Sequence, residues 1–195
     1  QLLLPLLIMR KFPACLLILL TLHLTAAGQN QEVDLLRMVD NLLLNSEFAE
    51  ALALLEKSSP ATGSAMLLNK KAEALMRNGD LGEAESLLLA LLERTDVQRD
   101  GYLKAITRSN LGFLQLNQGR SDLAEESLQN SILQFEQAGR GESPPAVQAF
   151  SHLGLVYMSQ GKYAQAQEHL HRAPSFRQAG KHANELIAAT YNDLG

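Results

Sequence analysis

The apolar and polar residues of the chain recur with the spacing of helices. Leu153 and Tyr157 are four residues apart, as are Ala166 and Leu170, and residues at that separation share one face of an α-helix. No stretch alternates apolar and polar side chains as a half-buried strand does. The pattern therefore predicts an all-α chain. The predicted helices cover residues 32–45, 47–58, 62–78, 81–94, 98–118, 121–138, 145–160, 163–173 and 182–195.

Helix-breaking residues mark where these segments end. Ser, Gly and Pro cluster at residues 58–60 and 139–145, which we interpret as breaks between structural units. Pro145 suits a first helical position, because proline has no N–H to donate there. Pro174 falls inside an expected helix, where proline costs about 3 kcal/mol. We therefore expect that helix to break near Ala173.

Key residues of these helices keep a repeated spacing. Leu111-Gly112 and Leu153-Gly154 begin two similar stretches, 42 residues apart. Eight residues after each Leu comes Gly, then Ala at thirteen, Leu at seventeen and a small residue at twenty. These are Gly119, Ala124, Leu128 and Ser131 in one stretch, and Gly161, Ala166, Leu170 and Ala173 in the other. An earlier unit begins at Lys71 (Leu75, Gly79, Leu81, Ala84, Leu88, Leu91), and a degenerate one begins at Met38 (Leu42, Ser46, Phe48, Ala51, Leu55).

This spacing predicts a helix, a tight turn and a second helix in each unit. Gly154 lets the neighbouring helix approach closely, although glycine costs about 1 kcal/mol in a helix. Gly161 is expected to end the first helix as a C-cap residue. Ala166 and Leu170 then face back onto that helix. One such pair cannot bury its apolar face alone, so neighbouring pairs must stack.

The pattern Leu153-Gly154…Tyr157…Gly161…Tyr163…Ala166…Leu170…Ala173 resembles the tetratricopeptide repeat. That family usually has a 34-residue period, and the 42-residue spacing is similar to its longer-helix variety, seen in kinesin light chains and many bacterial proteins. The resemblance covers residues 33–195 and departs at Lys71-Ala72, at Gln115 and at Ser121. It implies a right-handed α–α superhelix over residues 32–195, with the first helices lining a concave groove that binds a protein or peptide.

Candidate groove residues lie on the faces of the first helices that do not pack within their own pair. They are Asn69, Glu73, Met76 and Arg77, then Ser109, Phe113, Leu116 and Asn117, then Ser151, Leu155, Met158 and Ser159, and finally Asn192. Phe113, Leu116, Leu155 and Met158 would make this surface apolar, as partner-binding surfaces often are. The alternative is that neighbouring helices cover these four side chains. The Lys/Asn carboxylate clamp of chaperone-binding family members is not reproduced.

The first 28 residues have the order of a secretory signal peptide. Met9-Arg10-Lys11 precedes an apolar run from Phe12 to Leu24, and small residues at 25–28 follow. Cleavage after Ala27 or Gly28 would place the mature protein in the periplasm or outside the cell. The alternative is an uncleaved N-terminal membrane anchor. Residues 1–8 would lie upstream of a true start at Met9, and Tyr191–Gly195 would begin a further unit, so we interpret the sequence as a fragment.

Composition and charge argue against several kinds of chemistry. The formal net charge is −4 with no Lys/Arg run beyond two residues, whereas nucleic-acid binders usually carry a basic face. The single cysteine, Cys15, lies in the leader, which excludes a disulfide framework or a Cys-ligated zinc site from the mature segment. His169 and His171 point in different directions on a helix. We therefore interpret these two and the other mature histidines, His152 and His182, as solvated surface residues.

Acidic pairs are interpreted in the same way. Glu83/Glu85 and Glu125/Glu126 fall on the polar sides of amphipathic helices, where carboxylates are solvated rather than poised for acid–base catalysis. We therefore predict no catalytic, cofactor-binding or metal-binding residue and no small-molecule substrate.

Three functions remain open. The first is an exported, non-catalytic scaffold for protein–protein interaction. The second is the sensory or recruiting N-terminal part of a larger enzyme, a sensor kinase or caspase-like protease whose catalytic domain would lie beyond Gly195. The third is an assembly role in an outer-membrane or secretion complex.

Overall fold

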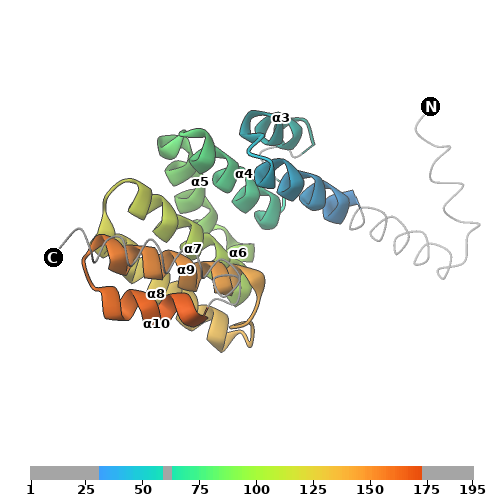
Figure 1. Ribbon diagram of the computed structural model, residues 1–195. Helices are drawn as coiled ribbons and strands as arrows, with labels where there is room; N and C mark the ends of the chain where they lie inside the picture. Colours follow the sequence, from blue (N-terminus) through green and yellow to red (C-terminus); the bar gives the residue numbers. More distant parts are fainter. Residues whose placement is uncertain (1–30, 59–62, 173–195) are drawn as a thin grey trace, which may run out of the picture. The chain divides into compact units, whose positions relative to one another are not determined.

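The computed structural model describes residues 31–58 and 63–172, and every regular element in these two ranges is a helix (Figure 1). The described residues divide into two compact units. Residues 31–47, with a helix over residues 31–44, belong to the first, and residues 48–58 and 63–172 belong to the second. The second unit contains α3 (Phe48–Ser58), α4 (Ala65–Asn78), α5 (Leu81–Glu93), α6 (Thr95–Arg99), α7 (Gly101–Asn117), α8 (Ser121–Gln137), α9 (Pro144–Ser159) and α10 (Tyr163–Arg172).

Helices of the second unit pack as successive pairs. α4 packs on α5, α7 on α8 and α9 on α10, and the second helix of each of the first two pairs also packs on the first helix of the next. The first helices contact one another in order, α4 with α7 and α7 with α9. Figure 1 shows the pairs following one another from green to red. The fold is the predicted all-α superhelical repeat.

The same turn closes each first helix. Gly79, Gly119 and Gly161 have φ angles of 97°, 75° and 72°, in the left-handed region that glycine enters at no steric cost. After α9, for example, the Gly161 N–H donates to the Met158 carbonyl and the Lys162 N–H to the Tyr157 carbonyl. This pair of bonds is the Schellman motif. The predicted C-cap role of Gly161 is therefore confirmed.

The degenerate unit uses this turn without glycine. Ser46 has a φ of 63°, its N–H donates to the Leu43 carbonyl, and the Glu47 N–H donates to the Leu42 carbonyl. Ser46 is the residue eight positions after Met38, where the other units carry glycine. The repeated spacing therefore located a turn even where its usual residue is missing.

The small residues predicted at the helix crossings are buried there. Ala84, Ala124 and Ala166 are at most 1% exposed, and Leu88, Leu128 and Leu170 are at most 5% exposed. A Cβ atom added to Gly112 would lie 2.6 Å from the Leu128 Cγ, so this crossing admits only glycine without rearrangement. The lysine that replaces leucine at Lys71 is half-buried and forms ion pairs with Glu56 and Glu83.

Helix bounds differ from the prediction at several places. α4 begins at Ala65 rather than at residue 62, with Ser64 as its N-cap, and α6 begins at Thr95 rather than at residue 98. The single helix predicted over residues 98–118 is divided into α6 and α7, because Asp100 caps α7 by accepting hydrogen bonds from the N–H groups of Tyr102 and Leu103. α9 begins at Pro144 rather than Pro145, with Ser143 as its N-cap. The helix predicted over 182–195, the break at Pro174 and the leader lie outside the described residues. None of the described helices combines the length and apolar character that crossing a bilayer requires.

Candidate functional site

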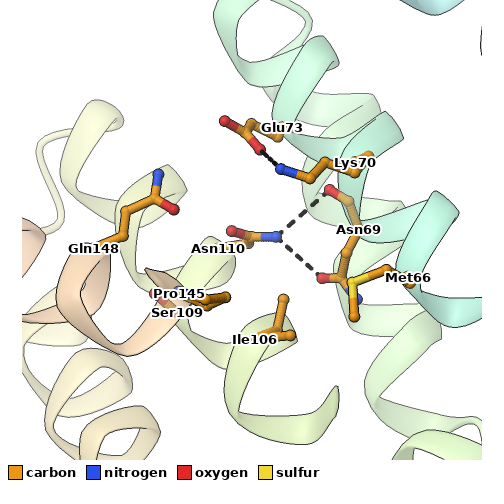
Figure 2. Close-up of a pocket in the computed structure, with 9 residues that line it drawn as sticks. All are labelled: Met66, Asn69, Lys70, Glu73, Ile106, Ser109, Asn110, Pro145 and Gln148. Atoms are coloured by element: carbon orange, nitrogen blue, oxygen red, sulfur yellow. Dashed lines mark hydrogen bonds and ion pairs between the residues drawn. The ribbon is translucent and has the colours of Figure 1, made fainter. Parts of the chain in front are cut away.

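A shallow pocket of about 50 Å³ lies where the three first helices meet (Figure 2). It is lined by α4, α7 and the first turns of α9. The lining residues are Met66, Asn69, Lys70, Glu73, Ile106, Ser109, Asn110, Pro145 and Gln148. Because consecutive repeats each supply one wall, the pocket exists only in the stacked array. Its position on the first helices is the position that the repeat pattern predicts for a groove.

Charged side chains of the pocket lie on α4. The Glu73 carboxylate accepts from the Lys70 Nζ at 3.0 Å and from an Arg77 guanidinium nitrogen at 3.2 Å. Two cations thus share one carboxylate. α9 has no Lys, Arg, Asp or Glu, so its wall offers neutral groups such as the Gln148 amide.

Beneath the pocket, an amide network joins α4 to α7. Asn69 is 2% exposed, and its Nδ2 donates to the Ala65 carbonyl at 2.9 Å and to the Thr107 Oγ1 at 3.0 Å. The Asn69 Oδ1 accepts from the Asn110 Nδ2 at 3.1 Å. Figure 2 shows the Asn110 amide with its nitrogen toward Asn69 and its oxygen toward Gln148. Because buried polar groups are stabilising only when paired, this network holds the two repeats in register.

The apolar candidates are half-buried rather than exposed. Leu116 and Met158 pack against the hydrophobic core, and Phe113 stacks on His152 with ring centroids 4.0 Å apart and planes at 11°. None of these, nor Leu155, is among the large hydrophobic side chains that the structure exposes. Neighbouring repeats therefore cover much of the surface that was expected to be apolar. Six of the nine residues that line the pocket are polar, although apolar atoms make up most of its surface.

The interpretation of the histidines as solvated surface residues is wrong for His152. This side chain is 7% exposed, and its ring is stacked on Phe113. Burial lowers its pKa from 6.5 to about 3, and the charge of Arg77 acts in the same direction. His169 is half-buried, with its ring 5.3 Å from that of Tyr157. The His152 ring thus packs between repeats, whereas the His169 ring packs on α9 within its own helix pair.

Of the predicted groove residues, the pocket brings together Asn69, Glu73 and Ser109. Arg77 is tied to Glu73 at its edge. Asn117 and Ser159 are exposed further along their helices, where Ser159 shares a hydrogen bond with Ser121, and Ser151 is half-buried. Asn192 lies outside the described residues.

Sequence reasoning missed Met66, Lys70, Ile106, Asn110, Pro145 and Gln148. The repeated spacing could have indicated most of them. Lys70 and Asn110 directly precede the first residue of their units, and Met66, Ile106 and Gln148 lie five residues before the first residue of theirs.

The acidic pairs are only partly solvated, which corrects their interpretation. Glu85 on α5 accepts hydrogen bonds from Gln118 and from Arg120, at 3.0 and 2.5 Å, in the turn of the next repeat. The bond from Arg120 and then that from Gln118 hold the pKa of Glu85 below its ordinary value. Glu83 and Glu126 are exposed, as expected.

The same arrangement recurs one repeat later. Glu125 on α8 accepts from Gln160 and from Lys162, at 3.0 and 3.1 Å. Burial opposes the ionisation of Glu125, but these hydrogen bonds outweigh it and lower the pKa. We call these two arrangements the Glu85 clamp and the Glu125 clamp. In the described part of the chain, no three His, Cys, Asp or Glu side chains are grouped so that they could hold a metal ion.

Comparisons with known proteins agree with this architecture. Residues 104–179 match the family model of the tetratricopeptide repeat. A solved structure of nearly identical TPR-like repeats from Podosopora anserina, of the kinesin light chain type, is similar to this chain. Its TM-score is 0.56 at 19% identity, over 76% of each chain.

The structure of BtubC (BKLC) from P. vanneervenii has a TM-score of 0.49 at 22% identity, over 85% of this chain and 63% of that one. No curated protein matches the sequence. Residues 104–179 thus match the tetratricopeptide repeat, and repeats of that family typically mediate protein–protein interaction.

Proposed function

We propose that this chain is an exported, non-catalytic scaffold of the long-period tetratricopeptide variety that holds an extended segment of a partner protein against α4, α7 and α9. The observation that carries the proposal is the pocket, in which three consecutive repeats present hydrogen-bonding side chains beside short apolar surfaces. Met66 and Ile106 supply the apolar contacts, while Asn110 and Gln148 supply amides. A peptide with alternating polar and apolar groups matches such a lining.

The pocket is suited to holding a segment rather than to transforming it. General acid–base catalysis needs a titratable group that reaches the substrate with a pKa near the working pH. The acid in the pocket, Glu73, is already paired with Lys70 and Arg77. The histidine nearest the groove, His152, is buried behind Phe113. These features support a binding function for residues 63–172.

Export is supported by the leader sequence. A basic start at residues 9–11, an apolar run to Leu24 and small residues at 25–28 are the three parts of a signal peptide. The test is expression of the chain from Met9 in a bacterial host, followed by fractionation and mass determination of the product. The proposal expects a mature N-terminus at Gly28 or Gln29 in the periplasmic fraction. A full-length product retained in the membrane fraction would instead indicate the uncleaved anchor.

Peptide binding is tested by selecting 12-residue peptides from a random phage-displayed library against the full chain. Their dissociation constants are then measured by fluorescence polarisation for the wild type and for Gln148→Arg, which places a long cationic side chain in the pocket. Gln137→Arg is the matched control, because Gln137 is equally exposed but lies on the second helix α8. We expect Gln148→Arg to weaken binding at least about tenfold and Gln137→Arg less than about twofold.

A photo-crosslinking residue at each of the same two positions provides an independent readout. The selected peptide should crosslink at position 148 and not at position 137. If no peptide is selected, or if both arginine variants bind it equally, the groove is not the binding surface and the proposal fails.

A further inference from the structure

We infer that Asn69, although buried, determines which hydrogen-bonding group the pocket offers, because it fixes the amide of Asn110 with the oxygen outward. The inference rests on the proposed function, since it concerns how the same pocket recognises a peptide. Asn69 was expected to contact a partner directly. At 2% exposure it cannot do so, and it acts instead as a positioning residue.

In each hydrogen bond of this network only one of the two groups can be the donor. The orientation of both amides, Asn69 and Asn110, is therefore fixed. The hydroxyl of Thr107 has a single proton, which it donates to the Leu103 carbonyl at 2.9 Å. Thr107 can therefore only accept from Asn69, and Asn69 must present its NH₂ group there. The second proton of that NH₂ is used by the Ala65 carbonyl. Both donors of Asn69 are thus committed, and only its oxygen remains for the next repeat.

Asn110 must in turn present its NH₂ group to that oxygen. Its Nδ2 lies 3.1 Å from the Asn69 Oδ1 and 3.5 Å from the Asn69 backbone oxygen. The amide oxygen of Asn110 consequently points the other way, toward Gln148 across the pocket (Figure 2). Turning the amide over would set two oxygens against each other and leave buried groups unpaired, which costs free energy. The pocket therefore offers a fixed acceptor at this point.

A fixed acceptor selects a donor, and the surrounding charges indicate a neutral one. The carboxylate that lines the pocket, Glu73, is already paired with Lys70 and Arg77. An ammonium or guanidinium group of a ligand would therefore have to compete with two cations for that carboxylate. The ligand group that fits is a main-chain N–H of an extended peptide. Recognition at Asn110 would then depend on the peptide backbone rather than on a particular side chain.

The test is a double-mutant cycle in which one change is N-methylation of the peptide and the other is substitution of Asn69. A peptide selected as above, whose binding is lost with Gln148→Arg, is synthesised with an N-methyl group at each residue in turn. Each dissociation constant is measured for the wild type and for Asn69→Leu, which removes the network without changing the size of the side chain much. In the wild type we expect methylation at one amide to weaken binding about tenfold. In Asn69→Leu the same methyl group should cost less than about threefold, because Asn110 is then free to turn.

Two further variants make the result decisive. Asn117→Leu replaces an exposed asparagine of α7 that does not line the pocket, and this variant should keep the full tenfold sensitivity to the methyl group. If Asn69→Leu does not unfold cooperatively on heating, Thr107→Val is measured in its place. This variant removes the hydroxyl that accepts from Asn69 and so releases the orientation of the Asn69 amide. Equal methylation costs in the wild type and in a folded Asn69 or Thr107 variant would overturn the inference, as would a wild type that tolerates every N-methyl group. Either result leaves peptide binding intact and so differs from failure of the proposed function.

Discussion

Leu170 lies directly over Gly154, with its Cγ and Cδ2 atoms 2.6 Å from the position that a Cβ atom on Gly154 would occupy. Gly112 and Leu128 have the same relationship one repeat earlier. Both leucines are almost fully buried, so neither can move aside without disturbing the core. The repeated Leu-Gly pair is therefore a packing requirement of each helix crossing.

Gly154→Ala should destabilise the protein by about 1–3 kcal/mol, since an added methyl group forces the two helices apart. Gly112→Ala should cost a similar amount. The measurement is urea unfolding followed by circular dichroism. Gly82→Ala is the control, because a Cβ atom there meets nothing within 4 Å, and it should leave stability unchanged or raise it slightly. Equal effects at positions 82 and 154 would contradict the close-approach argument.

Ser46→Gly should stabilise the protein by about 1 kcal/mol, because serine is strained at the positive φ that glycine adopts freely. The reciprocal change, Gly119→Ser at a φ of 75°, should lose a similar amount. The two variants are compared with the wild type by thermal and urea unfolding. If Ser46→Gly lowered the stability instead, the serine side chain would contribute more free energy to folding than the strained backbone at this position costs.

Acidification should unfold the protein partly through His152. Its pKa is about 3 in the folded protein against an ordinary 6.5, so the unfolded state binds this proton more readily. Stability is then fully present above pH 6.5 and falls as the pH is lowered toward 3, by about 2 kcal/mol between pH 7 and pH 5. Urea midpoints of the wild type and of His152→Asn at these two pH values measure the difference. An identical pH slope in both proteins would refute the assignment.

The Glu125 clamp should contribute little free energy by itself. The Lys162 side chain is 43% exposed and that of Glu125 21%, and such pairs are worth below about 1 kcal/mol. A double-mutant cycle with Glu125→Gln and Lys162→Met measures the coupling at low salt and in 1 M NaCl. We expect the coupling to shrink in high salt, because exposed charges are screened. A coupling well above 1 kcal/mol would mean that the clamp is effectively buried.

Much of the fold could be predicted from residues that pack within their own repeat. Gly154, Ala166 and Leu170 are close in sequence, and their sizes alone specify a helix crossing. Gly161 and even Ser46 were placed at turns by spacing. The division between α6 and α7 was missed because it depends on the cap that Asp100 provides, whereas the apolar periodicity continues across it.

The candidate site was less predictable because it is built between repeats. Asn69 and Thr107 are 38 residues apart, and nothing local to either residue indicates that each satisfies the other. His152 was interpreted as a surface residue together with the other histidines, but Phe113 of the preceding repeat covers it. Contacts of this kind follow from the angle at which repeats stack, which a single sequence does not specify.

The two clamps have a consequence for how such an array can change in evolution. Each joins a glutamate on one second helix to a Gln-Gly-Arg or Gln-Gly-Lys turn of the following unit. The unit that begins at Leu111 carries both halves, the turn at residues 118–120 and the acceptor Glu125. A copy of this unit inserted beside itself would meet a compatible neighbour on each side. Gene duplication could therefore lengthen the scaffold without redesigning this contact between units, and an engineer could do the same.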